Sequence, residues 1–229
     1  MKAMILAAGK GQRMRALTEQ TPKPLLKVQG RALIEHALAY CRQAGVREVV
    51  INVHTHAQQV MDYLGDGRAF GLTIQYSDER TGLQGTGGGV VRALPLLGDA
   101  PFLLLSADIV TDFTFDSLLE LNQNCLAHLV MVNNPEYNVD GDFGLEEGFI
   151  TRDGPCFTYS NIAVLSPQLF DGLAPGFIDL AAILRPAINK KQVRGSFYNG
   201  HWFNVGTPEA LSGLNQHAGR HHLGGCGKK

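Results

Sequence analysis

The chain has 229 residues, of which 45% are hydrophobic and 18% are charged. This composition excludes wholesale disorder, collagen-like repeats and a long coiled coil, and the length fits one α/β domain. The 20 Lys and Arg residues nearly balance the 21 Asp and Glu residues, giving a formal net charge of −1. We therefore expect no nucleic-acid partner and no membrane partner held by a basic surface.

Segments typical of strands and helices alternate along the chain. Residues 2–8 form an apolar run that ends in glycine, residues 31–44 place apolar side chains at helical spacing, and residues 47–54 are rich in β-branched side chains. A strand, a helix and a strand of this kind favour a right-handed parallel crossover. Further elements are predicted as strands at 72–76, 101–107, 127–132 and 158–165, and as helices near 56–64, 88–97, 116–123 and 208–217.

This alternation predicts the α/β class, as a single Rossmann-like three-layer α/β/α domain with a mostly parallel central sheet. We place the domain at residues 1–218, followed by a disordered, glycine-rich tail at residues 219–229. The four cysteines form no Cys-x-x-Cys pair, and no apolar run approaches the roughly 18 residues of a membrane span. We expect a cytoplasmic protein that is a monomer or a small homo-oligomer.

A glycine-rich loop, LAAGKGQRM at residues 6–14, directly follows the first predicted strand. In open α/β sheets ligands bind beyond the carboxyl ends of the strands, where this loop falls. Gly9 and Gly11 would let backbone amides approach a phosphate chain, and Arg13 would add positive charge. The loop lacks the third glycine of the dinucleotide fingerprint, because residue 14 is Met. Taken alone, the pattern also fits a plain tight turn.

A second cation lies in TPKPLLKV at residues 21–28, where Lys23 stands between two prolines. Prolines are expected to hold this segment extended, which would aim the ammonium group at a phosphate. A solvated lysine in a proline-bounded loop is the alternative.

Together these segments resemble the signature of the sugar-phosphate nucleotidyltransferases, enzymes that join a nucleoside triphosphate to a sugar 1-phosphate. The signature combines Gly-x-Gly-x-Arg, a Leu-Thr pair and Pro-Lys-Pro-Leu in fixed order. The resemblance covers residues 2–215 and continues through QGTGGGVVRAL at 84–94, SADIVTD at 106–112, GDFGLEE at 141–147, TYSNIAVL at 158–165 and WFNVGTPEAL at 202–211.

The resemblance implies a role for each matching residue, within the nucleotide-diphospho-sugar transferase type of fold. The catalytic residues would be Arg13, Lys23 and Asp108. Sugar binding would fall to Phe143, Gly144 and Asn161, and Mg²⁺, the implied cofactor, would bind Asp108 and Asn204. The nucleotide would contact Leu6, Ala8, Gly9, Gly11, Arg13, Lys23, Gly85 and Thr86.

The chain departs from the family pattern at Asn204, where the Trp-x-Asp motif has its second metal carboxylate. An amide offers a carbonyl oxygen but not the negative charge that holds Mg²⁺. Three interpretations stay open: an enzyme that works with one carboxylate, a weakened or altered enzyme, and a non-catalytic sugar-nucleotide binder.

The implied reaction joins UTP and an amino-sugar 1-phosphate, with N-acetylmuramate 1-phosphate as the expected sugar, to give a UDP-sugar and pyrophosphate in bacterial cell-wall recycling. The alternatives are GTP with mannose 1-phosphate and UTP with N-acetylglucosamine 1-phosphate. In each case the partners are small-molecule substrates.

Overall fold

The structure, a computed structural model, describes residues 1–115, 118, 121 and 124–217. The predicted tail at 219–229 lies outside the described residues, and so does most of the predicted helix at 116–123. Each of the other predicted elements is present, within a few residues of its expected ends.

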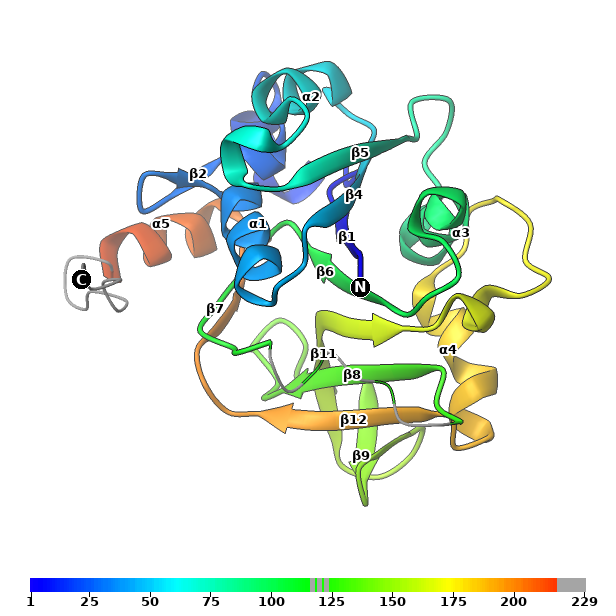
Figure 1. Cartoon of the computed structure of the whole chain (residues 1–229). Helices are drawn as coiled ribbons and strands as arrows, with labels where there is room; N and C mark the ends of the chain where they lie inside the picture. Colours follow the sequence, from blue (N-terminus) through cyan, green and yellow to red (C-terminus); the bar gives the residue numbers. More distant parts are fainter. Residues whose placement is uncertain (116–117, 119–120, 122–123, 218–229) are drawn as a thin grey trace, which may run out of the picture.

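A nine-stranded sheet forms the centre of the molecule (Figure 1). In sheet order its strands are β5 (Thr73–Asp78), β4 (Glu48–Val53), β1 (Ala3–Leu6), β6 (Phe102–Ser106), β11 (Cys156–Leu165), β8 (Ala127–Val132), β12 (Val193–Tyr198), β10 (Phe149–Thr151) and β9 (Phe143–Glu146).

The sheet is mixed, so the prediction of a mostly parallel sheet is wrong for one half of it. β5, β4, β1 and β6 are parallel, as expected, but β11 runs antiparallel to both β6 and β8. Between β8 and β11 the chain forms the β9–β10 hairpin and no crossover helix. Parallel neighbours are usually joined by a helical crossover. Here residues 133–155 contain a hairpin instead, and β11 returns antiparallel to β8.

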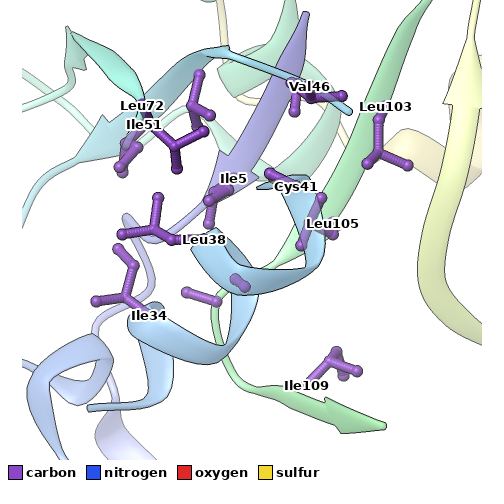
Figure 2. Close-up of a cluster of buried hydrophobic side chains, with 14 of the residues drawn as sticks. Ile5, Ile34, Leu38, Cys41, Val46, Ile51, Leu72, Leu103, Leu105 and Ile109 are labelled. Atoms are coloured by element: carbon purple, nitrogen blue, oxygen red, sulfur yellow. The ribbon is translucent and has the colours of Figure 1, made fainter. Parts of the chain in front are cut away.

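Helices cover both faces of the sheet, which gives the predicted three layers. On one face lie α1 (Leu33–Gln43) and α2 (Ala57–Leu64), packed against alternate strand residues such as Ile5. Figure 2 shows Ile34, Leu38 and Cys41 of α1 pointing toward these strands. Their spacing of three and four residues puts them on one face of the helix.

The opposite face of the sheet carries α3 (Gly85–Leu97) and α4 (Leu180–Asn189) (Figure 1). Met4, between Ala3 and Ile5, faces this second core, as the two-residue period of a strand requires. The sequence pattern missed α4, whose buried positions nevertheless follow helical spacing: Leu180, Ile183, Leu184, Ala187 and Ile188.

Two short ribbons stand apart from the central sheet. A two-stranded ribbon pairs β7 (Ile109–Thr111) with β13 (Trp202–Asn204), and a second ribbon pairs β2 (Lys27–Val28) with β3 (Arg31–Ala32). The remaining elements are α5 (Pro208–His217) and the 3-10 helices η1 (Gln12–Thr18), η2 (Lys23–Leu25), η3 (Arg68–Phe70) and η5 (Pro167–Phe170). No helix in the described part of the chain is long and apolar enough to cross a membrane.

Candidate active site

The glycine-rich loop after β1 is fixed to the core at both ends. Ala7 N donates a hydrogen bond of 2.7 Å to Asn52 Oδ1. Gly11 adopts the left-handed conformation, with φ of 62°, immediately before η1, and its carbonyl accepts hydrogen bonds from Met14 N at 2.8 Å and Thr18 Oγ1 at 3.1 Å. The conformation therefore explains Gly11, whereas at Gly9 an added Cβ would meet nothing within 4 Å.

Lys23 is brought to the site by a short turn. The predicted extended arm is wrong in detail: Pro22 is extended, but residues Lys23–Leu25 form the 3-10 helix η2 with Leu26 N bonded to Lys23 O. From this turn Lys23 Nζ donates a hydrogen bond to Asp108 Oδ2. Their side chains are 14% and 19% exposed, so this ion pair is shielded from most of the solvent.

Asp108 and Asn204 meet through the β7–β13 ribbon. The register pairs Asn204 with Ile109, and Val205 N donates to Asp108 O at 2.9 Å. Within the part of the chain that the structure describes, Asp108 Oδ1 and Asn204 Oδ1 are both buried without a hydrogen-bond partner. Buried oxygens normally have partners, and two such hard oxygen atoms suit a divalent cation of the Mg²⁺ type. The residues present therefore fit the implied metal.

A cavity of about 610 Å³, which we call the first cavity, lies above the carboxyl ends of β1 and β6. Arg13, Lys23 and Asp108, the three predicted catalytic residues, all line it. An added Cβ at Gly206 would lie 3.3 Å from Arg13 Nη2, so glycine at this position lets the guanidinium lie close to the β13–α5 turn. The first cavity is also lined by every residue predicted to contact the nucleotide: Leu6, Ala8, Gly9, Gly11, Arg13, Lys23, Gly85 and Thr86.

Glycines of the second glycine-rich segment also serve the packing of the protein. They open helix α3 and pack against residues 176–178, while Gly85 and Thr86 line the first cavity. Gly87 N and Gly88 N both donate to Ile178 O, at 2.9 and 3.0 Å. An added Cβ at Gly88 would lie 1.9 Å from Gly176 O. Protein backbone, rather than ligand, therefore requires glycine at Gly88.

Asn52 and Glu79 connect the two loops, and the sequence analysis missed both. Glu79 is completely buried and accepts hydrogen bonds from Asn52 Nδ2 at 2.8 Å and from Gln84 N at 3.3 Å. Since Asn52 Oδ1 also holds Ala7 N, one buried polar chain runs from the first loop to the start of α3. Both residues line the first cavity. An asparagine within the apolar run VVINV was the signal that could have identified this connection.

A second cavity of about 720 Å³ adjoins the first and shares Leu6, Thr86 and Asp179 with it. Asn204 lines the second cavity while Asp108 lines the first, so the ribbon that joins them lies where the cavities meet. The other lining residues are Tyr137, Asn138, Gly141, Asp142, Phe143, Arg152, Thr158, Tyr159, Asn161, Leu180, Ala181, Leu184, Arg185 and Trp202.

Two of the three predicted sugar-binding residues, Phe143 and Asn161, line the second cavity. Asn161 has a positive φ of 59° in an irregularity of β11, where the register with β8 shifts. Gly144 does not line the cavity. An added Cβ there would lie 2.2 Å from Thr151 Oγ1, so this glycine serves the packing of the β9–β10 hairpin.

Burial keeps the protons on two tyrosines that line the second cavity. Burial raises the pKa of Tyr159 well above its usual range, and its hydroxyl is buried without a partner among the described residues. Burial also raises the pKa of Tyr137; the charge of Arg13 opposes this, while Asp108 and Asp142 add to it. Both phenols are therefore protonated at neutral pH.

Two adjoining cavities, a lysine–carboxylate pair, and two buried oxygens that have no hydrogen-bond partner among the described residues form an arrangement suited to anionic substrates and a cation. Residues 2–145 match the model of the family described as nucleotidyl transferase. The chain belongs to this family, which confirms the resemblance seen in the sequence.

Individual relatives agree with this assignment. The chain is 44% identical over 216 residues to the N-acetylmuramate alpha-1-phosphate uridylyltransferase of Neisseria meningitidis serogroup B, covering 90% of this chain and 94% of that one. It is 31% identical over 224 residues to the protein of the same name in Caulobacter vibrioides, covering 91% and 93%. It is also 31% identical over 231 residues to the mannose-1-phosphate guanylyltransferase catalytic subunit beta of Dictyostelium discoideum, covering 93% and 64%.

The fold is shared with a solved structure from Bacillus anthracis, provisionally described as a glucose-1-phosphate thymidylyltransferase in complex with sucrose. The TM-score is 0.86 over 98% of each chain, at 21% sequence identity. At this identity the likeness concerns the fold alone.

Proposed function

We propose that this protein transfers the uridylyl group of UTP to N-acetylmuramate 1-phosphate, giving UDP-N-acetylmuramate and pyrophosphate. The observation that carries the proposal is the pair of adjoining cavities, with the Lys23–Asp108 ion pair lining the first and Asn204, on the strand paired with the residues after Asp108, lining the second. The 44% identity to a uridylyltransferase over nearly the full length of both chains supports this choice of substrates.

In the proposed reaction an oxygen of the sugar phosphate forms a bond to the α-phosphorus of UTP. The bond from that phosphorus to the bridging oxygen of the β-phosphate breaks, and pyrophosphate leaves with the bonding electron pair. Both reactants are anions, so catalysis depends on holding them together and balancing their charge. The first cavity would take UTP and the second cavity the sugar, with the reacting phosphates at their junction.

Arg13 and Lys23 supply the positive charge of the protein in this mechanism. The planar guanidinium of Arg13 can bind two phosphate oxygens, whereas the Lys23 ammonium acts as a point charge. Lys23 pairs with Asp108, and a triphosphate in the first cavity would offer it a more highly charged partner. Exchange of Lys23 from the carboxylate to a phosphate would then free Asp108 for the metal.

Asp108 and Asn204 would hold Mg²⁺, which supplies positive charge against the phosphate oxygens when bound. One carboxylate, one amide oxygen and substrate oxygens form an adequate ligand set, because Mg²⁺ in enzymes commonly uses one or two carboxylates plus phosphate.

The proposal extends to the setting of the enzyme. We infer a Rossmann-like catalytic domain over residues 1–218, a cytoplasmic location, a monomeric or small homo-oligomeric state, and a place in bacterial cell-wall recycling. Support comes from the near-neutral charge, the cysteine pattern and the uridylyltransferase relatives. The near-neutral charge also argues against a nucleic-acid or membrane partner.

The direct test measures pyrophosphate release from UTP, N-acetylmuramate 1-phosphate and Mg²⁺. Release should require all three, and the variant Asp108→Asn, with the shape of the side chain retained, should lose it. A panel of nucleoside triphosphates and sugar 1-phosphates completes the experiment. Silence of the wild type and of Asn204→Asp with every pair would refute nucleotidyl transfer.

Two alternatives have specific observations behind them. The guanylyltransferase relative favours GTP with mannose 1-phosphate. UTP with N-acetylglucosamine 1-phosphate is a further pair with the same chemistry, and preference in the panel would identify either pair. Asn204 in place of a carboxylate favours a sugar-nucleotide binder with weak turnover. That alternative predicts UDP-sugar binding by calorimetry, little dependence on Mg²⁺ and no pyrophosphate.

A further inference from the structure

Two arginines line the second cavity on elements that pack against each other. Arg152 directly follows β10, and Arg185 lies on α4 beside Leu184, which packs in the same core as Ile150 of β10. Along α4, Ala181, Leu184 and Arg185 all face the cavity, as their spacing of three and four residues permits.

Neither the Arg152 side chain nor the Arg185 side chain forms an ion pair or a hydrogen bond with any residue that the structure describes. By contrast, Arg31, Arg68 and Arg80 each pair with a nearby carboxylate. The guanidinium groups of the two cavity arginines are thus available to a ligand.

Two carboxylates, Asp142 and Asp179, also line the second cavity, and neither pairs with these arginines. Asp142 Oδ2 accepts a hydrogen bond of 2.8 Å from Tyr159 N. Asp179 is the residue before α4 and also lines the first cavity, which places it at the junction. Arg185 lies six residues further along the helix, or about 9 Å at the helical rise. Arg185 therefore lies away from the junction, in the part of the second cavity into which the sugar rather than its phosphate would extend.

This inference rests on the proposed function, in which the sugar 1-phosphate enters with its phosphate at the junction. N-acetylmuramate differs from N-acetylglucosamine by a lactyl ether on carbon 3, which ends in a carboxylate. Arginine matches carboxylates through paired, charge-assisted hydrogen bonds. We propose that Arg152 and Arg185 bind the carboxylate of the sugar substituent and so select an acidic amino sugar over a neutral one.

The test compares three sugar 1-phosphates: N-acetylmuramate 1-phosphate, its methyl ester, which keeps the size but not the charge, and N-acetylglucosamine 1-phosphate. The variants are Arg152→Gln, Arg185→Gln and the double variant. Arg68→Gln is the matched control, because the Arg68 side chain is 89% exposed and lines neither cavity. Calorimetric binding of each sugar 1-phosphate accompanies the measurement of KM and kcat.

The double variant should raise KM and Kd for N-acetylmuramate 1-phosphate on the order of tenfold or more, the effect of losing a charge-assisted hydrogen bond, with kcat little changed. Values for the two neutral sugars should stay within about twofold, and Arg185→Lys should recover part of the loss. Equal changes in KM and Kd for all three sugars, or no change for the acidic sugar, would overturn this inference. Neither result would contradict the proposed nucleotidyl transfer. A wild type that neither binds nor converts any of the three would overturn the proposed function as well.

Discussion

Asp108 and Asn204 lie on neighbouring backbone segments, which the hydrogen bond from Val205 N to Asp108 O joins, and each side chain presents a buried oxygen without a partner in the described structure. These two oxygens carry different charge, since one belongs to a carboxylate and the other to an amide. This difference leads to the first prediction.

Asn204→Asp should tighten metal binding. The added negative charge strengthens the attraction for Mg²⁺, so the concentration of Mg²⁺ that gives half-maximal activity should fall on the order of tenfold. Calorimetry should likewise show tighter Mg²⁺ binding in Asn204→Asp than in the wild type. Asn204→Ala should bind Mg²⁺ more weakly than the wild type. An unchanged metal affinity in Asn204→Asp would show that residue 204 is not a ligand.

Replacing Lys23 should slow the reaction more than it weakens substrate binding. Lys23→Met removes a preorganised cation, and we expect kcat to fall by about 10² to 10³, as when an electrostatic donor is removed elsewhere. Steady-state kinetics with UTP and the sugar 1-phosphate measure the effect. Lys27→Met, at an exposed position outside both cavities, is the control. A change in KM alone, with kcat preserved, would contradict a catalytic role for Lys23.

Asn52→Leu should both destabilise the fold and weaken nucleotide binding. The substitution removes the acceptor of Ala7 N and a donor to the buried Glu79. Leaving such buried groups unpaired costs about 1 to 3 kcal/mol each. Urea unfolding should show the loss, and KM for UTP should rise because the first loop loses its anchor.

The matched control for Asn52 is Asn133→Ala, since Asn133 Nδ2 donates to Asn199 Oδ1 at an exposed position. This variant should leave stability and KM nearly unchanged. If Asn52→Leu behaved in the same way, the polar chain between the loops would not position the nucleotide.

Local sequence patterns predicted many of the elements, but not all of them and not the direction of every strand. The spacing of Ile34, Leu38 and Cys41 was enough to locate α1, because a helix buries one face whatever its neighbours are. The direction of β11 depends on the hairpin before it, and residues 141–151 gave no separate strand signal. Helix α4 was missed although its spacing is regular; Pro186 within it weakens the helical pattern.

The family motifs predicted which residues line the first cavity, but not the contacts that the fold makes between distant residues. Arg13 and Lys23 both follow β1, so the family motif and the expected ligand position beyond the carboxyl end of a strand indicated the same residues. The Lys23–Asp108 pair joins residues 85 apart, and the Asn52–Glu79 link joins residues 27 apart. Spacing carries no information about such contacts. Gly87 and Gly88 show the reverse case, because a glycine run looks the same whether a ligand or Ile178 approaches it.

The stability of the protein should fall as the solution becomes acidic. Burial lowers the pKa of His36 and of His128 below the ordinary 6.5, and the charge of Arg194 adds to this at His128. At pH values between the lowered pKa values and 6.5, the unfolded chain then binds more protons than the folded chain. As far as these two histidines are concerned, the free energy of unfolding should therefore be constant above pH 6.5 and decrease below pH 6.5.

His128→Asn isolates this pH effect, because asparagine can still bond to Ser196 Oγ, as His128 Nε2 does at 3.0 Å. Urea unfolding of both proteins at pH 5 and pH 7.5 should give a smaller difference in the variant. An equal or larger difference would mean that His128 titrates alike in the folded and unfolded states.

Two alanine substitutions should separate the glycines that the protein needs from those that a ligand would need. In Gly88→Ala the new Cβ would meet Gly176 O at 1.9 Å, so residues 176–178 must move away from α3. We expect a loss of about 1 to 3 kcal/mol in the free energy of unfolding, as for overpacking in a core, whether or not a nucleotide is added.

In Gly9→Ala the new Cβ meets no described atom within 4 Å, and the φ of residue 9 is not in the left-handed region. This variant should keep its stability and instead raise KM for UTP, because the methyl group would project toward the first cavity. Unfolding and kinetics measured on both variants test the distinction, and a Gly9→Ala protein with unchanged KM would place the nucleotide away from the first loop.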